Sequence, residues 1–210
     1  MRAFVLTLLA LPVSAAEVRD AARGFSFTVP DGYEAASAPG ALYAYARGTV
    51  GEGSFAMLTV SGLGGTLGAD SKLNPAIVEA AAKESAAASG VSVSDFRYAK
   101  TKWGEHELDE VFSRASGNGL EAVSLTVQVP LKREAIQLVM IGSAGDEAQL
   151  RGEFRAVLAS LEGESSWLTE AERDRKLGEG VGRLVGFSLP VLGVAVWALV
   201  RLVLKRRRTA

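Results

Sequence analysis

The chain has 210 residues and a formal net charge of −1, with 48% hydrophobic residues and no cysteine. The lack of cysteine excludes disulfides, thiolate metal sites and a cysteine nucleophile. Charge is unevenly distributed, because residues 17–179 hold all 24 acidic side chains but only 16 of the 23 basic ones, a formal charge of −8. An acidic module of this kind repels a phosphate backbone, so nucleic acid is not an expected partner.

Residues 1–16 have the pattern of a secretory signal peptide. One early cation precedes an apolar run from Ala3 to Leu11, and small residues follow a proline. The pattern predicts export, with cleavage after Ala15 or Ala16. The apolar run is too short to cross a bilayer, and an uncleaved anchor is the alternative.

Residues 17–164 are expected to form one extracytoplasmic α+β domain, an antiparallel sheet flanked by helices. Alternating apolar side chains between glycine- and proline-bearing turns predict three early strands. A helix follows, with Asn74 as its cap and Gly90 after its end. Its apolar stripe is expected from Ile77, Val78, Ala81, Ala82 and Ala88. The predicted ranges are Phe25–Val29, Leu42–Arg47 and Ser54–Ser61 for the strands and Pro75–Ser89 for the helix.

Four successive strands and a second helix complete the predicted domain. Strands that follow one another favour antiparallel hairpins. In the third of them, residues 122–129 alternate between polar and apolar side chains, as in a sheet with one exposed face; the fourth is apolar on both faces and is expected at the centre. Asp146 is the expected helix cap. The strands are Ser94–Trp103, Glu105–Arg114, Leu120–Val129 and Ala135–Gly142, and the helix is Glu147–Leu161, with Leu150, Phe154, Val157, Leu158 and Leu161 on one face.

The C-terminal part predicts a stalk followed by a membrane anchor. Residues 165–182 combine a charged helix, opened by the capping box Thr169–Glu172, with a series of glycines. The next stretch has no charged side chain from Leu184 to Val200, and with a snorkelling arginine its apolar run of about 21 residues covers the ~30 Å hydrocarbon core. Residues 183–204 are therefore expected to form a transmembrane helix, with a buried core helix as the alternative.

Residues 205–210 form a basic tail with four consecutive cations, Lys205–Arg208. By the positive-inside rule this tail is expected in the cytoplasm. Together with the signal peptide, it predicts a single-pass protein of the bacterial inner (plasma) membrane whose N-terminal domain is periplasmic or extracytoplasmic.

Four strand and turn patterns resemble those of the PsbP-like extracytoplasmic proteins. They are GFSFTVPDGY (residues 24–33), WGEHELDEVFSR (103–114), AVSLTVQVP (122–130) and LASLEG (158–163). That group includes the extrinsic photosystem subunit and bacterial secreted or lipid-anchored proteins of the DcrB type. The resemblance implies an antiparallel sheet flanked by helices and a role in binding partners or ligands, and it carries over no active-site residue. The added membrane helix departs from the lipid-anchored members.

His106 is the only histidine, and it lies among carboxylates. Imidazole and carboxylate ligands can bind a metal ion, but strand alternation directs His106 to one face and Glu105, Glu107 and Asp109 to the other. No G-x-S-x-G elbow or S-x-x-K pattern is present, and nothing singles out a catalytic carboxylate pair. The sequence therefore predicts no metal site, no cofactor and no enzymatic activity.

A glycine-rich loop, residues 61–74, lies between a predicted strand and a predicted helix. Its Gly62, Gly64, Gly65 and Lys72 are the candidate ligand-binding residues. The order of a phosphate-binding loop is absent, and a mobile surface loop is the alternative.

Gly178, Gly182 and Gly186 recur every fourth residue towards the membrane helix. This spacing allows two helices to approach closely and predicts self-association or docking on another envelope protein. A flexible glycine stalk is the alternative.

These features together predict a non-enzymatic, membrane-anchored binding or accessory module of the bacterial envelope. Two alternatives stay open: a surface protein whose stalk, helix and basic tail form a cleaved sorting signal, and an envelope hydrolase. The intact mass of the mature protein would decide the first, and loss of turnover on His106→Ala would support the second.

Overall fold

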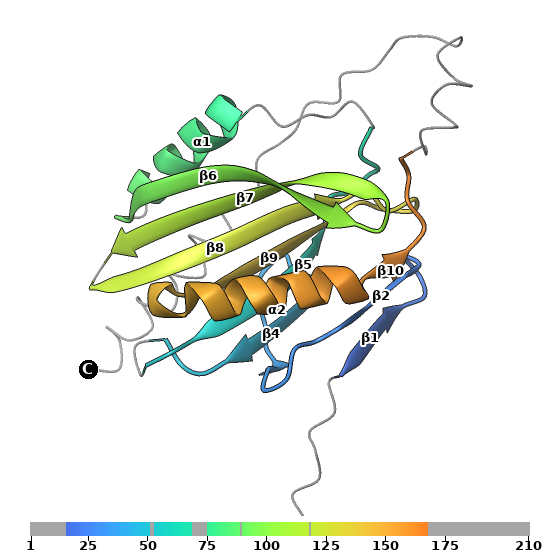
Figure 1. Cartoon of the computed structure of the whole chain (residues 1–210), viewed down its shortest axis with the longest axis horizontal. Coiled ribbons are helices and arrows are strands. Elements are labelled where there is room, and N and C mark those ends of the chain that lie inside the picture. Colours follow the sequence, from blue (N-terminus) through green and yellow to red (C-terminus); the bar gives the residue numbers. More distant parts are fainter. Residues whose placement is uncertain (1–15, 51–52, 69–74, 89, 118, 168–210) are drawn as a thin grey trace, which may run out of the picture.

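A computed structural model describes residues 16–50, 53–68, 75–88, 90–117 and 119–167 (Figure 1). Within these ranges the chain forms antiparallel sheets and two α-helices, so the predicted α+β class is confirmed. Most of the predicted signal peptide and stalk, and all of the predicted transmembrane helix and tail, lie outside the described residues. Neither α-helix within them has the length and apolar character needed to cross a membrane.

Seven antiparallel strands form the larger sheet of the described structure. β9 lies at its centre with side chains buried on both faces, as the sequence predicted. The last four strands of this sheet, β6 to β9, each pair with their neighbours in sequence, as expected of hairpins. In spatial order the strands are β3 (Glu34–Ala35), β4 (Tyr43–Arg47), β5 (Ala56–Gly62), β9 (Ile136–Ser143), β8 (Leu120–Val129), β7 (His106–Gly117) and β6 (Ser92–Trp103).

A smaller sheet packs beside the β4 end of the larger one. It consists of β1 (Glu17–Asp20), β2 (Phe25–Thr28) and β10 (Glu162–Gly163), with β2 in the middle. Aromatic rings join the two sheets, because Phe27 makes edge contacts with both Tyr43 and Tyr45 of β4. The sequence did not predict β1, β3 or β10, because β3 and β10 have two residues each and β1 has a single apolar side chain, too little to show a period.

Helix α2 (Glu147–Ser160) covers one face of the larger sheet (Figure 1). Its apolar side packs on β8, β9 and β2 in the main hydrophobic core, as predicted. The chain enters it through a 3₁₀ turn, η1 (Ala144–Asp146). Asp146 occupies the N-cap position, as predicted, but its backbone is not extended (φ −103°, ψ 16°) and its side chain makes no capping hydrogen bond. The buried side chains of α2 are Leu150, Phe154, Val157 and Leu158.

Helix α1 (Pro75–Ala88) packs on the outer strand β6. Val78 and Ala82 contact Phe96 and Tyr98 of that strand. Ile77, which the sequence analysis placed in the buried stripe, is 59% exposed. The stripe is wrong at this position because the helix touches only the edge of the sheet, where a narrow line of residues spaced by four is enough.

The face of the sheet opposite α2 is also buried along much of its centre. The sequence predicted an exposed face here, but Ala122, Ser124 and Thr126 of β8 are all buried. Phe55, which precedes β5, packs on Ala122 and on two apolar side chains of β9. The prediction of a half-buried sheet is therefore wrong for β8. The side chains on its polar face are small, and larger neighbouring side chains such as Phe55 shield them from solvent.

Gly142 of β9 makes room for α2. A Cβ at this position would come within 2.7 Å of the Leu150 side chain and 2.6 Å of the Phe55 carbonyl oxygen. Gly142→Ala is expected to lower the free energy of unfolding by about 1–3 kcal/mol through overpacking, as measured by denaturant-induced unfolding. The control is Gly152→Ala, at an exposed position of α2 with nothing within 4 Å of a Cβ. This control should raise stability by about 0.5–1 kcal/mol, and an equal gain for Gly142→Ala would contradict the packing.

Candidate functional site

A charged cluster fills the angle between α2 and strands β6 and β7. At its centre is the buried ring of Phe112, with the Cζ atoms of Arg151 and Arg97 at 4.4 and 4.7 Å from the ring centroid. Cation–π contacts of this kind are worth about 0.5–2 kcal/mol each, more as water is excluded. We call the group the arginine cluster; its members are Asp95, Arg97, Glu110, Phe112, Arg114, Glu147 and Arg151.

The arginine cluster ties α2 to the outer strands through ion pairs. Arg151 donates from Nε to Glu147 of its own helix at 3.0 Å and from Nη1 to Glu110 of β7 at 3.3 Å. Arg114 of β7 donates to the same Glu147 at 2.7 Å. Glu110 has a side chain only 6% exposed, and Arg151 is its ion-pair partner. With three cations and three carboxylates, the cluster leaves no net charge to attract a charged ligand.

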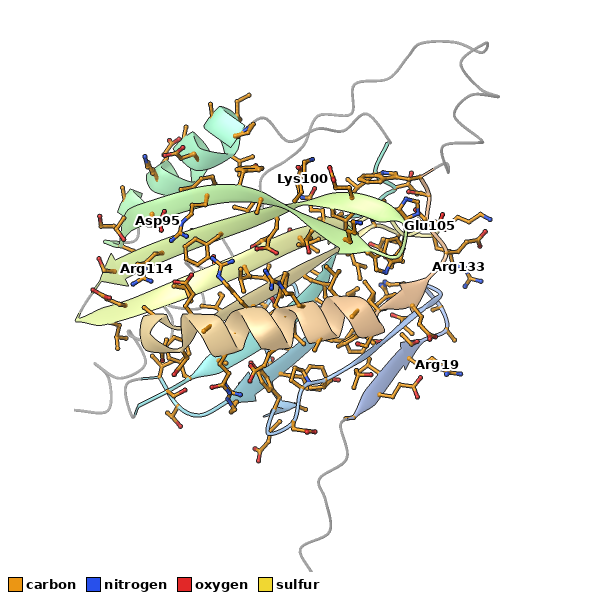
Figure 2. All side chains as sticks on the ribbon, in the orientation of Figure 1. Arg19, Asp95, Lys100, Glu105, Arg114 and Arg133 are labelled. Atoms are coloured by element: carbon orange, nitrogen blue, oxygen red, sulfur yellow. The ribbon has the colours of Figure 1, made fainter. Side chains whose placement is uncertain are left out.

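The same contacts lower the pKa of two carboxyl groups. The hydrogen bond from Arg97 Nε, at 2.8 Å, holds the pKa of Asp95 below its ordinary value. Burial raises the pKa of Glu147, but hydrogen bonds from Arg151 and Arg114 outweigh it and the net pKa is lowered. Figure 2 shows Asp95 and Arg114 at the same end of β6 and β7, where they are direct cross-strand partners. Both carboxylates are therefore ionised at neutral pH and unsuited to act as general acids.

Sequence reasoning did not find the arginine cluster. Two local signals were present, because Glu147 and Arg151 are spaced by one helical turn and Asp95 and Arg97 share one face of a strand. No local sequence pattern indicates that both pairs lie around Phe112. Their proximity depends on the β6–β7 register and on the position of α2 on the sheet.

A second polar cluster lies on the other flank of α2, towards β4. Glu153 accepts hydrogen bonds from Tyr33 Oη at 2.7 Å and from Gln149 Nε2 at 2.8 Å, and it pairs with Arg47. The Arg47 guanidinium also lies over the Tyr33 ring, 5.2 Å from its centroid. Burial, followed by the hydrogen bond to Glu153, raises the pKa of Tyr33, so its hydroxyl stays protonated and donates. This cluster fixes β4 to the helix.

The glycine-rich loop is described as far as residue 68, and its start is bonded to the segment that precedes β9. Gly64 N donates to Glu134 Oε1 at 3.1 Å, and the backbone of Ala135 bonds on both sides, to Leu63 and Gly65. A Cβ at Gly62 would come too close to the Glu134 carboxylate, so a larger residue there would displace that side chain. The Glu134 carboxylate already accepts the hydrogen bond that the Gly64 amide donates, and this disfavours binding of an anionic ligand at this point. Ligand binding by Gly62, Gly64 and Gly65 stays a prediction, and Lys72 lies outside the described residues.

A chain of charges connects that loop to the β1–β2 turn. Arg23 donates from Nε to Glu134 at 2.8 Å and from Nη1 to Asp20 at 3.1 Å. Asp20 also accepts from the Arg23 amide at 2.9 Å and from Tyr43 Oη at 3.2 Å. Burial raises the pKa of Asp20, but these hydrogen bonds outweigh it, and the net pKa lies below 3.8. Asp20 thus joins the turn to β4, and Arg23 connects Asp20 to Glu134, which holds the loop.

His106 lies against two indole rings. Its ring centroid is 5.6 Å from that of Trp103 and 6.0 Å from that of Trp167. The neighbouring carboxylates turn elsewhere, because Asp109 pairs with Lys100 at 2.6 Å and Glu110 with Arg151. Among the described residues no three potential metal ligands come together. Gly178, Gly182 and Gly186 lie outside those residues, so the helix-association face stays a prediction.

No protein-family model matches the chain, and no curated protein matches it. Among solved structures, the chain is similar to the cyanobacterial PsbP protein of Synechocystis (CyanoP), with a TM-score of 0.50 and 11% identity over 76% of this chain and 98% of that one. The chain therefore has a PsbP-like α+β fold, as its strand and turn patterns indicated. At this identity the likeness concerns the fold alone.

Two further structures are similar at lower scores. The Ran-binding protein Mog1p of Saccharomyces cerevisiae has a TM-score of 0.45 and 8% identity, over 73% of this chain and 97% of that one. LpqN, involved in cell envelope biogenesis of Mycobacterium tuberculosis, has a TM-score of 0.40 and 13% identity, over 73% and 86%. At these scores the two structures carry no argument about this chain.

Removal of Arg151 tests the arginine cluster. Arg151→Ala leaves Glu110 buried without its cation and is expected to lower the free energy of unfolding by about 2 kcal/mol. Denaturant-induced unfolding measures the change. The matched control is Arg155→Ala, one turn further along α2 at an exposed position, with an expected change within about 0.5 kcal/mol. Equal effects of the two substitutions would show that the cluster contributes nothing.

The lowered pKa of Asp20 predicts a loss of stability in acid. Because the folded pKa lies below the unfolded one, the carboxylate stabilises the fold above an unfolded pKa of about 3.9, and this stabilisation is lost as pH falls through the folded pKa. Between about pH 5 and pH 2.5 the unfolding temperature should therefore fall more for the wild-type chain than for Asp20→Asn. Asp31→Asn, at an exposed turn, should keep the wild-type pH dependence. Parallel curves for wild type and Asp20→Asn would contradict this assignment.

Proposed function

We propose that the chain is a non-enzymatic, membrane-anchored binding or accessory module of the bacterial envelope. A signal peptide at residues 1–16 exports the domain, and a helix at residues 183–204 holds it at the inner membrane with the tail in the cytoplasm. The partner is another envelope protein, a second copy or a small ligand. The PsbP-like fold supports a binding role.

The observation that carries this proposal is the apolar stretch of residues 184–204, considered beside the core of the described domain. Within the described residues, Val129, Leu138 and Phe154 are at most 1% exposed in a core whose buried members lie between Val18 and Leu161. An apolar stretch of that length needs an apolar environment, and a bilayer provides one.

One hydrogen bond distinguishes the two proposed cleavage positions. The Ala16 carbonyl accepts a hydrogen bond from Val29 N at 2.9 Å, which extends the β1–β2 pairing by one residue. Cleavage after Ala15 preserves this bond, whereas cleavage after Ala16 removes its acceptor. We therefore propose cleavage after Ala15, with Ala16 as the first residue of the mature chain.

Fractionation and mass spectrometry of the native protein test the anchor. Carbonate washing of membranes is expected to leave the full chain in the pellet, and protease added to spheroplasts should digest the domain. The intact mass should correspond to residues 16–210. Deletion of residues 178–210 should release a folded, soluble domain. Release of the full chain by carbonate, or protection from protease, would overturn the proposal, and a mass ending before residue 183 would favour the cleaved sorting signal.

Affinity capture after crosslinking in native membranes separates the candidate contact surfaces. Partners that persist after deletion of residues 178–210 bind the sheet domain, and partners that disappear bind through the deleted segment, which contains Gly178, Gly182 and Gly186. Substitution of Gly182 and Gly186 by leucine in the full chain serves as the matched test, since it blocks close helix approach and leaves the anchor in place.

A further inference from the structure

The last described residues, 164–167, form a short extended segment that we call the strap. In Figure 1 it is the orange trace that continues from β10 past the turn between β6 and β7. The strap pairs with the segment between β8 and β9, because Lys132 N donates to the Glu164 carbonyl at 2.7 Å and Ser166 N donates to the Pro130 carbonyl at 2.6 Å. The predicted stalk therefore begins on the surface of the domain.

Side chains of the strap reach two further segments. Ser166 Oγ lies 3.2 Å from the Leu67 carbonyl oxygen of the glycine-rich loop and 3.1 Å from the Pro130 carbonyl oxygen, so its single hydrogen is shared between them. The Trp167 ring packs on the main core and meets the His106 ring edge to face, with the centroids 6.0 Å apart. The strap thus connects the loop, the β8–β9 segment and the β6–β7 turn.

The two indole groups at this end of the domain differ in their hydrogen bonding. Trp103 is 6% exposed and donates from Nε1 to the Leu161 carbonyl at 2.8 Å. Trp167 Nε1 is also buried, but within the described part of the chain it has no hydrogen-bond partner. An N–H group that leaves water without finding an acceptor opposes the burial of its own ring. Trp167 is therefore held more weakly than its apolar contacts alone would hold it.

The rest of the strap adds little to its stability. Its first residue is exposed and the other three are half-buried. The ion pair between Lys132 and Glu164 is screened by water, because the two side chains are 60% and 72% exposed. Ordering four residues also costs conformational entropy, which two backbone hydrogen bonds and one half-buried ring have to offset. The docked and the free strap therefore lie close in free energy.

We infer that the strap is a latch that opens and closes while the rest of the domain stays folded. Opening breaks its two backbone hydrogen bonds, releases the Leu67 carbonyl of the loop and uncovers the His106 ring. It ends at Gly163, which is packed closely on the buried side chain of Leu131 and paired with β2. Segments with few buried apolar contacts open in this way at a free energy well below that of global unfolding.

The latch lies between the candidate binding loop and the proposed membrane anchor. In the closed state the loop is bonded to the first residues of the stalk, and in the open state the loop and the stalk move independently. A partner that binds one of these states more tightly would shift the equilibrium between them. This regulatory role rests on the proposed function, whereas the opening itself does not depend on the anchor.

Hydrogen exchange of the full chain in detergent, followed by mass spectrometry at residue resolution, measures the opening. The amides of Lys132 and Ser166 report the latch, and the amide of Met140 in the central strand β9 reports the whole domain. The two latch amides are expected to be protected, yet to exchange at least about a hundredfold faster than that of Met140. Exchange as slow as that of Met140, or no protection at all, would overturn the inference.

Replacement of the indole N–H tests the cause of the weak docking. The tryptophan analogue 3-benzothienylalanine has sulfur in place of the N–H, so it keeps the shape of the ring and removes the donor. At position 167 it should slow exchange of the latch amides about tenfold, because the buried unpaired donor is gone. Unchanged or faster exchange of these amides would overturn the inference.

The matched control is the same replacement of Trp103. It removes the hydrogen bond to the Leu161 carbonyl and should speed exchange of the Met140 amide about tenfold. Equal effects of the two replacements on Met140 would show that both rings belong to the core, and would overturn the inference.

Trp167→Ala is the second variant. It should abolish protection of the latch amides and leave that of Met140 unchanged, whereas a fall in Met140 protection would overturn the inference. A chain whose latch opens but which carbonate releases from membranes would keep this inference and lose the proposed anchor. A chain that stays in the membrane but whose strap opens only with the whole domain would keep the proposed function and lose the latch.

Discussion

The contact between α2 and the centre of the larger sheet is the one on which the other features of this domain depend. Leu150, Phe154 and Val157 of the helix are buried to 1% exposure or less. Full burial of a large apolar side chain is worth about 1.5–3 kcal/mol, so these three and their partners supply a large share of the net stability of a domain of this size. Gly142 allows this close approach because it leaves the space that Leu150 occupies.

The position of α2 also determines where the charged groups lie. One flank of the helix meets β7 through Arg151 and Glu110, and the other meets β4 through Glu153 and Arg47. Ion pairs this close to the core require good geometry, because each desolvated charge is costly without its partner. The two clusters therefore fix the rotation and the position of the helix along the sheet, while apolar packing supplies the attraction.

The two faces of the larger sheet serve different purposes. The α2 face is apolar at its centre, and ion pairs and hydrogen bonds lie at its margins. The opposite face has small and polar side chains at its centre, such as Ser124 and Thr126, and Phe55 covers part of it. Apolar burial on the α2 face therefore supplies most of the attraction between the layers.

The sequence predicted those parts of the fold that have a strong period. The central position of β9 and the apolar stripe of α2 follow from patterns over eight residues or more, which local chemistry determines. Ile77 was misplaced because a stripe on a helix shows which residues can be buried and not how wide the facing surface is. The polar face of β8 was expected in solvent, since alternation gives two faces and cannot tell what covers the second. The arginine cluster depends on the β6–β7 register, which no local pattern contains.

The end of the described chain has a mechanical consequence. Glu164 and Ser166 accept and donate backbone hydrogen bonds with Lys132 and Pro130, at 2.7 and 2.6 Å, in a short antiparallel ladder beside β10. Tension applied to the chain beyond Trp167 would act first on these hydrogen bonds. They would break one after another before the hydrophobic core is disrupted. A tether attached at this point can therefore yield by several residues and lengthen under strain while the folded body stays intact.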